Sequence, residues 1–295
     1  MVRKKVNKED AISGYLMISP WIIGFICFIL VPMIISFVLI FFKWDLISKP
    51  SFIGFDNFSR LSHDDLFLKS LLNTFYYTFI GVPLHIIIAL FLAVALNLRI
   101  RFIKFYRLLY FIPFVMPASA VAIVWLYLLY PDFGFANAVL SWLHLPELKW
   151  LFDPILSKPI LILIYLWQFG QTMIIFLAAL QGVPESYYEA AEIDGASRWS
   201  KFISITVPII SPTIFFNFIL NFVWSFQVFS FAYIMTKGGP SNSTLFYVLN
   251  IWRNAFEYFR MGYASLLSWI LFVVILLFTI IQFKLQNKWV FYETK

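Results

Sequence analysis

Charged side chains are scarce in this chain. Its 22 basic and 15 acidic residues make up 13% of 295 positions, against about 25% in an ordinary soluble domain. Apolar residues make up 62% of the chain, and 36 of them are Phe. So few charges cannot cover the surface of a soluble protein of this length. Despite the net charge of +7, this excludes a soluble enzyme, a disordered chain and a nucleic-acid-binding protein, and it indicates a core that faces lipid as well as protein.

Cysteine is almost absent, and the residues that build catalytic or metal sites are few and scattered. Cys27 is the single cysteine, so the chain cannot form an internal disulfide. The three histidines, His63, His85 and His144, are far apart in the sequence and form no metal-ligand or triad pattern, which argues against a membrane-embedded enzyme. For His85, inside an apolar stretch, we expect a hydrogen bond between helices rather than proton transfer.

Charge is missing altogether from six stretches of the chain. Each has 22 or more residues, and about 20 are needed to cross the hydrocarbon core of a bilayer. Their apolar runs lack the alternation of barrel strands, and backbone groups in lipid must be paired within the segment, so we expect helices. The sequence therefore predicts an all-α integral membrane protein with six transmembrane helices, approximately at 11–42, 71–98, 108–130, 159–180, 208–236 and 261–283.

The basic residues indicate the orientation of these helices. The first stretch is too long for the core of a signal peptide, so we interpret it as the first span. The ten residues at its N-terminal end, the segment 99–107 and the segment after 283 are all rich in Lys and Arg. Because cytoplasmic loops carry an excess of these residues, we expect both termini to be cytoplasmic. The same topology makes the 181–207 segment cytoplasmic, and that segment is acidic.

Within this segment, the sequence predicts two short helices joined by a tight turn. Pro184 suits a first helical position, Gly195 suits the left-handed position after a helix, and Ser197 can cap a second helix limited by Pro208. Glu189 shares a helix face with the next acid, three residues on. From physical reasoning alone, a solvated loop and a rigid acidic projection that docks on a partner are equally good interpretations.

The spacing of these residues resembles a known motif. Glu189-Ala190-Ala191, three residues, Gly195, nine residues, Ile205, one residue and Val207-Pro208 is similar to the EAA loop of permease subunits of ABC importers, with Val207 in place of the commonest Leu. The resemblance implies that a loop at 183–208 fits a cleft on a separate ATPase subunit. It assigns ATPase coupling to Glu189, Ala190, Ala191 and Gly195, and we add Asp194, which lies between them.

Further motifs extend the resemblance over nearly the whole chain, as one transmembrane domain at 1–295. Gly14-Tyr15-Leu16-x-x-Ser19-Pro20, Phe52-x-Gly54-x-x-Asn57-Phe58 and Thr236-Lys237-Gly238-Gly239-Pro240 are similar to motifs of the carbohydrate branch of these permeases, although Lys237 replaces a glycine of the family. This implies a type I ABC importer permease fold, a sugar substrate and a bacterial cytoplasmic (inner) membrane location. The implied partners are a second, non-identical permease subunit, two ATPase subunits and an extracellular solute-binding protein.

Polar residues inside the expected fourth and fifth spans are candidates for the substrate pathway. Asn217, Asn221 and Ser225 recur every four residues and form one stripe on a helix. Uncharged amides and hydroxyls suit a hydroxyl-rich substrate, but membrane helices also use them to hydrogen-bond each other, and both interpretations stay open. The resemblance favours a pathway role, and the candidate set is Gln168, Gln171, Asn217, Asn221, Ser225 and Gln227.

The chain contains no phosphate-binding loop of the Gly-x-x-x-x-Gly-Lys-Ser/Thr type. We therefore expect a non-enzymatic subunit without a cofactor of its own, with ATP and Mg bound by the partner ATPase subunits. Two alternatives remain: a permease for a non-sugar solute such as a polyol phosphate, and a secondary transporter. Intramembrane carboxylates, which commonly couple ions to transport, are absent from all six stretches, and this disfavours the second alternative.

Overall fold

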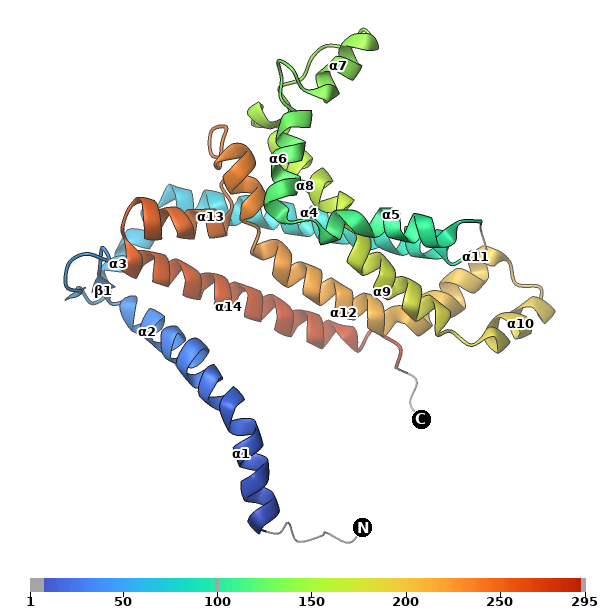
Figure 1. Ribbon diagram of the computed structural model, residues 1–295, viewed down its shortest axis with the longest axis horizontal. Coiled ribbons are helices and arrows are strands. Elements are labelled where there is room, and N and C mark those ends of the chain that lie inside the picture. The colour runs from blue at the N-terminus through green and yellow to red at the C-terminus, as the bar shows by residue number, and fades with distance from the viewer. Residues whose placement is uncertain (1–7, 99–100, 293–295) are drawn as a thin grey trace. The chain divides into compact units, whose positions relative to one another are not determined.

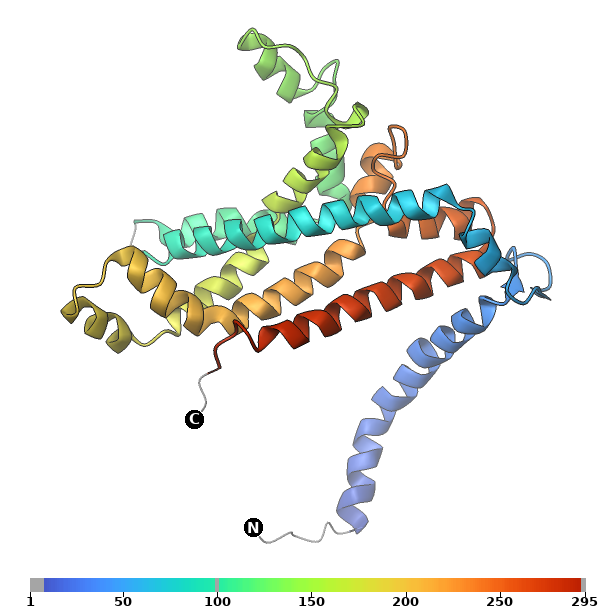
Figure 2. The ribbon, with the colours of Figure 1, turned by 180° about the vertical axis from the view of Figure 1, so that it is seen from behind.

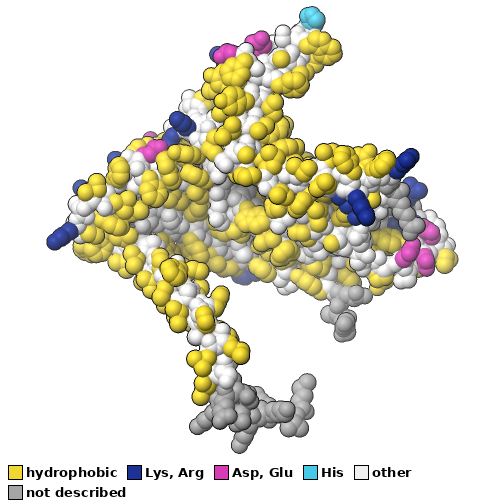
Figure 3. Space-filling model, in the orientation of Figure 1, with side chains coloured by type: hydrophobic (Ala, Val, Ile, Leu, Met, Phe, Trp, Pro, Cys, Tyr) yellow, Lys and Arg dark blue, Asp and Glu magenta, His cyan; other side chains and the backbone are white. Residues whose placement is uncertain are grey.

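The computed structural model describes residues 8–98 and 101–292 (Figure 1). Arg99 and the basic residues at positions 3–5, used above for orientation, lie outside this range. The chain forms two compact units, residues 1–63 with 251–270 and residues 64–250 with 271–295. Figure 3 shows hydrophobic side chains over most of the visible surface, as contact with lipid requires.

The first unit contains a long apolar helix, a two-stranded hairpin and a short helix. The strands β1 and β2 pair antiparallel, with Phe42 opposite Phe52. The buried Asn57 donates from its side-chain amide to the carbonyl oxygens of Ile40 (2.7 Å) and Phe42 (3.2 Å), and so fixes α3 to the hairpin. The elements are α1 (Lys8–Phe25), a π-helical turn (Ile26–Leu30), α2 (Val31–Leu39), β1 (Phe42–Lys43), β2 (Ser51–Phe52), α3 (Asp56–Leu61), a second π-helical turn (Arg253–Glu257) and the start of α14 (Met261–Gln286).

A glycine permits the hairpin to approach the start of α14. A Cβ atom on Gly262 would overlap the carbonyl oxygen of Phe42 and lie 2.9 Å from that of Leu39. The backbone N–H of Met261 donates to the carbonyl of Trp44 at 2.9 Å, which holds the two segments together. Only a residue without a side chain fits at position 262.

The second unit is a helical bundle. Its core forms where α4, α9 and α12 meet, around Val82, Ala89, Met173 and Ile210. The elements are α4 (Asp65–Leu96), α5 (Ile103–Val115), α6 (Ala118–Leu128), α7 (Phe135–Trp142), a 3₁₀ turn (Trp150–Phe152), α8 (Ser157–Trp167), α9 (Gly170–Gln181), α10 (Glu185–Ile193), α11 (Arg198–Lys201), a π-helical turn (Phe202–Thr206), α12 (Val207–Phe226), another π-helical turn (Ala232–Thr236), α13 (Tyr247–Trp252), which extends into the first unit, and the rest of α14.

The six expected spans appear as four continuous helices and two bent pairs. Over the described residues, four helices are long and apolar enough to cross a membrane: Ile12–Leu39, Asp65–Leu96, Arg198–Phe226 and Met261–Gln286. The expected third and fourth spans are broken. The halves of the third span, α5 and α6, meet at 97°, and those of the fourth, α8 and α9, meet at 44°. If each bent pair is taken as one span, the described residues contain six spans. The first break lies at Met116, which takes an extended conformation before Pro117, as a residue preceding proline does.

The fifth helix differs from its expected bounds at both ends. It begins at Arg198 and passes through Pro208, because the π-helical turn just before this proline accommodates the missing donor. The expected second short helix is therefore the first part of the fifth span. The α-helix ends at Phe226, ten residues before the expected boundary at 236, with Gln227 as its C-cap.

Candidate functional site

The 183–208 segment forms a helix pair that extends past the ends of α9 and α12 (Figures 1 and 2). Pro184 is the N-cap residue rather than the first helical residue, so α10 begins one position later than expected. Ser197 caps α11 as expected, accepting from the backbone N–H of Ser200 at 3.2 Å. We refer to residues 185–201 as the α10–α11 hairpin.

The turn of the hairpin depends on Gly195, whose φ is +75°. The backbone N–H of Ala196 donates to the carbonyl of Ala191 at 2.9 Å, and that of Gly195 donates to Glu192 at 3.0 Å. These bonds close the C-terminal end of α10 around a left-handed residue, as the glycine at this position predicted. The candidate coupling residues Glu189, Ala190, Ala191, Asp194 and Gly195 therefore all lie on α10 or in its terminal turn.

The two central acids of α10 have different surroundings. Glu192 accepts a hydrogen bond from Lys201 Nζ at 2.6 Å, and this bond and the positive charge lower the pKa of the Glu192 carboxyl. The bond ties α10 to α11. Glu189 is exposed, and among the described residues it has neither an ion pair nor a hydrogen-bonded side chain. Its carboxylate is therefore available to a basic group of another protein.

Two large apolar side chains project from the hairpin and were not among the predicted site residues. Ile193 is 87% exposed and Trp199 is 71% exposed. Exposed apolar groups beside charges are typical of surfaces that bind a partner. Their sequence signal was an Ile and a Trp inside a strongly polar segment between two apolar stretches.

The polar stripe of α12 points into the helical bundle. Asn221 accepts from Tyr165 Oη at 3.0 Å and donates to Thr172 Oγ1 at 3.2 Å. Ser225 donates to Thr78 Oγ1 at 3.0 Å. The amide of Asn217 donates to a carbonyl one turn earlier in α12. All three residues of the stripe are at least 96% buried, so in this conformation the stripe joins α12 to α4, α8 and α9.

The three glutamines lie at less enclosed positions. Gln168, at the break between α8 and α9, donates to the carbonyl of Pro113 in α5 at 3.4 Å. Gln171 is half-buried, without a hydrogen-bonded side chain among the described residues, and Gln227 is exposed. The substrate roles of the six polar residues stay predictions.

His85 and Tyr165 complete the buried polar cluster around Asn221. The histidine ring stacks on Tyr165, with 4.5 Å between centroids, and its Nε2 lies 3.3 Å from Thr172 Oγ1. The expected hydrogen bond between helices at His85 is confirmed. Tyr165 and Thr172 were missed because isolated hydroxyls in apolar stretches are common in membrane helices.

Long apolar helices, broken spans and a projecting polar hairpin define a multi-pass membrane protein of the permease type. Residues 63–291 match the family model of the binding-protein-dependent transport system inner membrane component, and the chain belongs to this family of ABC transporter permeases.

Several relatives cover almost the whole chain. It is 42% identical to the probable ABC transporter permease protein YesP of Bacillus subtilis (strain 168), over 100% of this chain and 97% of that protein. It is 32% identical to the trehalose/maltose transport system permease protein MalF of Thermococcus litoralis, over 95% of each chain. A chain of a bacterial alginate ABC transporter, solved in complex with an alginate pentasaccharide-bound periplasmic protein, matches with a TM-score of 0.85 and 25% identity, over 95% of this chain and 96% of that one. The fold is that of a type I ABC importer permease.

Proposed function

We propose that this chain is the membrane-spanning subunit of an ATP-driven importer and forms part of the pathway for a sugar or oligosaccharide. The observation that carries the proposal is the exposed α10–α11 hairpin, which bears the unpaired Glu189 and two exposed apolar side chains. Such a surface needs a partner, and separate ATPase subunits that bind ATP and Mg are that partner in our proposal. The chain itself acts as a permease without an ATPase site.

The carbohydrate assignment is supported by the named relatives. Besides the trehalose/maltose permease and the alginate transporter, the chain is 32% identical over 95% of its length to the lactose transport system permease protein LacF of Rhizobium radiobacter. In our proposal, an extracellular binding protein delivers the solute, and a second, homologous permease subunit completes the pathway. The assembly lies in the bacterial cytoplasmic membrane with both termini of this chain inside.

The coupling role is tested with two matched substitutions on one helix, Glu189→Gln and Glu192→Gln. Because only Glu192 has an internal partner, Glu189→Gln should weaken ATPase-subunit binding and uptake more strongly. The charge reversal Glu189→Lys should abolish uptake and leave membrane insertion intact. The measurements are uptake into proteoliposomes and co-purification of the ATPase subunits. Unimpaired uptake by the inserted Glu189→Lys protein would show that the coupling assignment is wrong.

The substrate class is tested on the reconstituted complex of permeases, ATPases and binding protein. A panel of disaccharides, oligosaccharides, sugar-acid oligomers and polyol phosphates is assayed for stimulation of ATP hydrolysis. Stimulation by a sugar supports the proposal, and stimulation by a polyol phosphate alone contradicts the carbohydrate assignment. Uptake that persists without ATPase subunits would favour a secondary transporter.

A further inference from the structure

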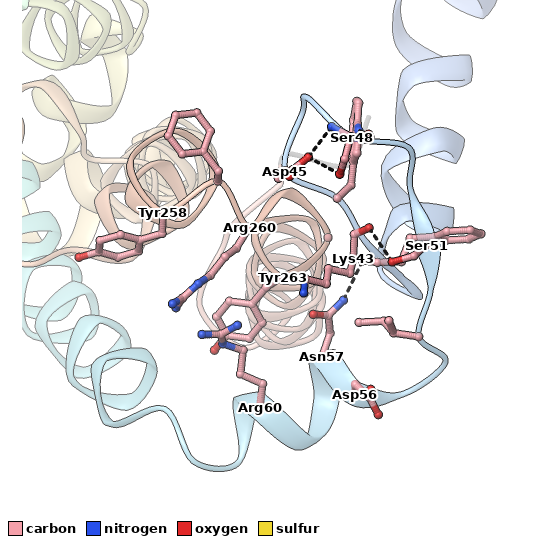
Figure 4. Close-up of a pocket in the computed structure, with 15 residues that line it drawn as sticks. Lys43, Asp45, Ser48, Ser51, Asp56, Asn57, Arg60, Tyr258, Arg260 and Tyr263 are labelled. Carbon is pink, nitrogen blue, oxygen red and sulfur yellow. Dashed lines mark hydrogen bonds between the residues drawn. The ribbon is translucent and has the colours of Figure 1, made fainter.

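A pocket of about 760 Å³ opens within the first unit, between the β1–β2 hairpin, α3 and the start of α14 (Figure 4). Its lining comes from two segments, 42–60 and 258–263. These segments connect the first span to the second and the fifth to the sixth. In a chain with six crossings, both connections emerge on the side opposite the 181–207 segment. If the α10–α11 hairpin is cytoplasmic, the pocket opens to the outside.

Three basic side chains line this pocket: Lys43, Arg60 and Arg260. The Arg60 guanidinium lies over the ring of the buried Tyr263, 5.3 Å from its centroid, and that of Arg260 lies 5.5 Å from the centroid of Tyr258. Figure 4 shows both guanidinium groups on the Tyr263 side of the pocket. Stacking on an aromatic ring leaves the N–H edge of a guanidinium free to bind an acceptor.

Neither acid of the pocket forms an ion pair with these arginines. Asp45 Oδ1 accepts from the backbone N–H groups of Ile47 (3.1 Å) and Ser48 (2.7 Å) and from Ser48 Oγ (2.7 Å), and these bonds lower the pKa of Asp45 to about 2. Asp56 lies in the first turn of α3, apart from both guanidinium groups in Figure 4. Within residues 8–98 and 101–292, no carboxylate forms an ion pair with either arginine.

We infer that Arg60 and Arg260 receive a carboxylate side chain of the extracellular solute-binding protein when it docks on this subunit. The inference rests on the proposed function, in which such a protein delivers the substrate. A carboxylate matches the planar fork of N–H donors that arginine offers.

The surroundings of the pocket favour a protein over an anionic lipid. The pocket contains acids as well as bases, whereas anionic headgroups attract clusters of four or more basic residues. Phe52 and Phe55, on the same hairpin and at the start of α3, are 72% and 71% exposed. Aromatic residues and arginines are both enriched in protein–protein interfaces.

The test uses the complete transporter in lipid vesicles and the binding protein that stimulates its ATP hydrolysis. The measured quantity is the concentration of binding protein that gives half-maximal stimulation, for the wild-type complex and for Arg260→Glu, Arg260→Lys and Lys49→Glu. Lys49 is exposed on the same unit and does not line the pocket, so it is a matched control. The Arg260 backbone bonds, to Asn254 and Ala264, do not involve its side chain.

We expect Arg260→Glu to raise the half-maximal concentration about tenfold, since an interfacial charge pair becomes a repulsion. Arg260→Lys, which keeps the charge but loses the planar fork, should raise the value less than Arg260→Glu. Lys49→Glu should change it less than about twofold and leave basal ATP hydrolysis unchanged. Equal shifts in Arg260→Glu and Lys49→Glu, or no shift in either, would overturn the inference.

Two further outcomes would assign the pocket to another ligand and would also overturn the inference. One is a shift in Arg260→Glu whose size changes with the phosphatidylglycerol content of the vesicles. The other is a loss of uptake confined to sugars that carry a carboxylate, at an unchanged half-maximal concentration. If no binding protein stimulates the wild-type complex, the proposed function fails, and this inference fails with it.

Discussion

The glycine that closes α10 is a sensitive point of the hairpin, and Gly195→Ala tests it. With φ at +75°, an alanine must adopt the left-handed conformation, yet its Cβ would meet no heavy atom within 4 Å. The cost is therefore backbone strain alone, about 1–2 kcal/mol. Because about 1.4 kcal/mol corresponds to a tenfold change in an equilibrium constant, the closed turn should open about tenfold more often.

The assay for this prediction is hydrogen exchange at the Gly195 and Ala196 amides, whose bonds to Glu192 and Ala191 close the turn. Exchange at both should accelerate about tenfold in Gly195→Ala, and uptake should fall. Gly182→Ala is the matched control, since Gly182 has a φ of −83° and the nearest heavy atom to a Cβ there is at 3.4 Å. Gly195→Asn should lie between the two, because asparagine tolerates the left-handed region better.

Equal exchange rates in Gly195→Ala and Gly182→Ala would refute this reasoning. The turn would then not depend on the left-handed residue. Faster exchange with unchanged uptake would separate the geometry of the turn from transport, and would show that a rigid turn is unnecessary for coupling.

Three other changes probe the membrane core and the loops. Asn221→Ala removes two hydrogen bonds between helices and should lower the free energy of unfolding by about 1–2 kcal/mol, measured as a lower melting temperature in detergent. Gly262→Ala should sharply reduce the yield of folded protein, because its Cβ overlaps backbone, whereas Gly24→Ala, with no heavy atom near its Cβ, should behave like wild type. The pKa of Glu192 is lowered in the folded protein, so its bond to Lys201 is complete above the ordinary pKa of a glutamate and is lost as the pH falls through the lowered value. The hydrogen-exchange protection factors of the hairpin, which are corrected for the intrinsic pH dependence of exchange, should therefore fall on acidification, and Glu192→Gln should remove this dependence.

The sequence predicted helix positions well where charge alone set the boundaries. The absence of charge placed the bounds of the sixth span within three residues of those of α14, and the bounds of the second within six residues of those of α4, whose first turns carry charge. It could not show the break at Met116, because a proline inside an apolar stretch is compatible with either a gentle kink or a sharp bend. The end of the fifth helix at Phe226 was missed for a similar reason, since the following residues are equally apolar.

The candidate site was predictable where turn chemistry is local. Gly195 and Ser197 take the turn and cap positions that their residue types favour. The partner of Lys201 was not predictable, because Glu189 and Glu192 share one face of α10 and the geometry of the turn decides which of them Lys201 reaches. Likewise, the spacing of Asn217, Asn221 and Ser225 predicted a shared face, and the direction of this face depends on packing between helices distant in sequence.

The break between α5 and α6 has a consequence for the lipid boundary. At a sharp bend, the last carbonyl oxygens of α5 lack the backbone N–H donors that a continuing helix would provide, and hydrocarbon supplies no donor. Gln168 donates to one of them, the Pro113 carbonyl, from the neighbouring helix pair. The bend is therefore tolerated only on a side of the bundle shielded from acyl chains. Substituting Gln168 with leucine would remove this donor and leave the Pro113 carbonyl unpaired, so the shape of the third span depends on a side chain of the fourth.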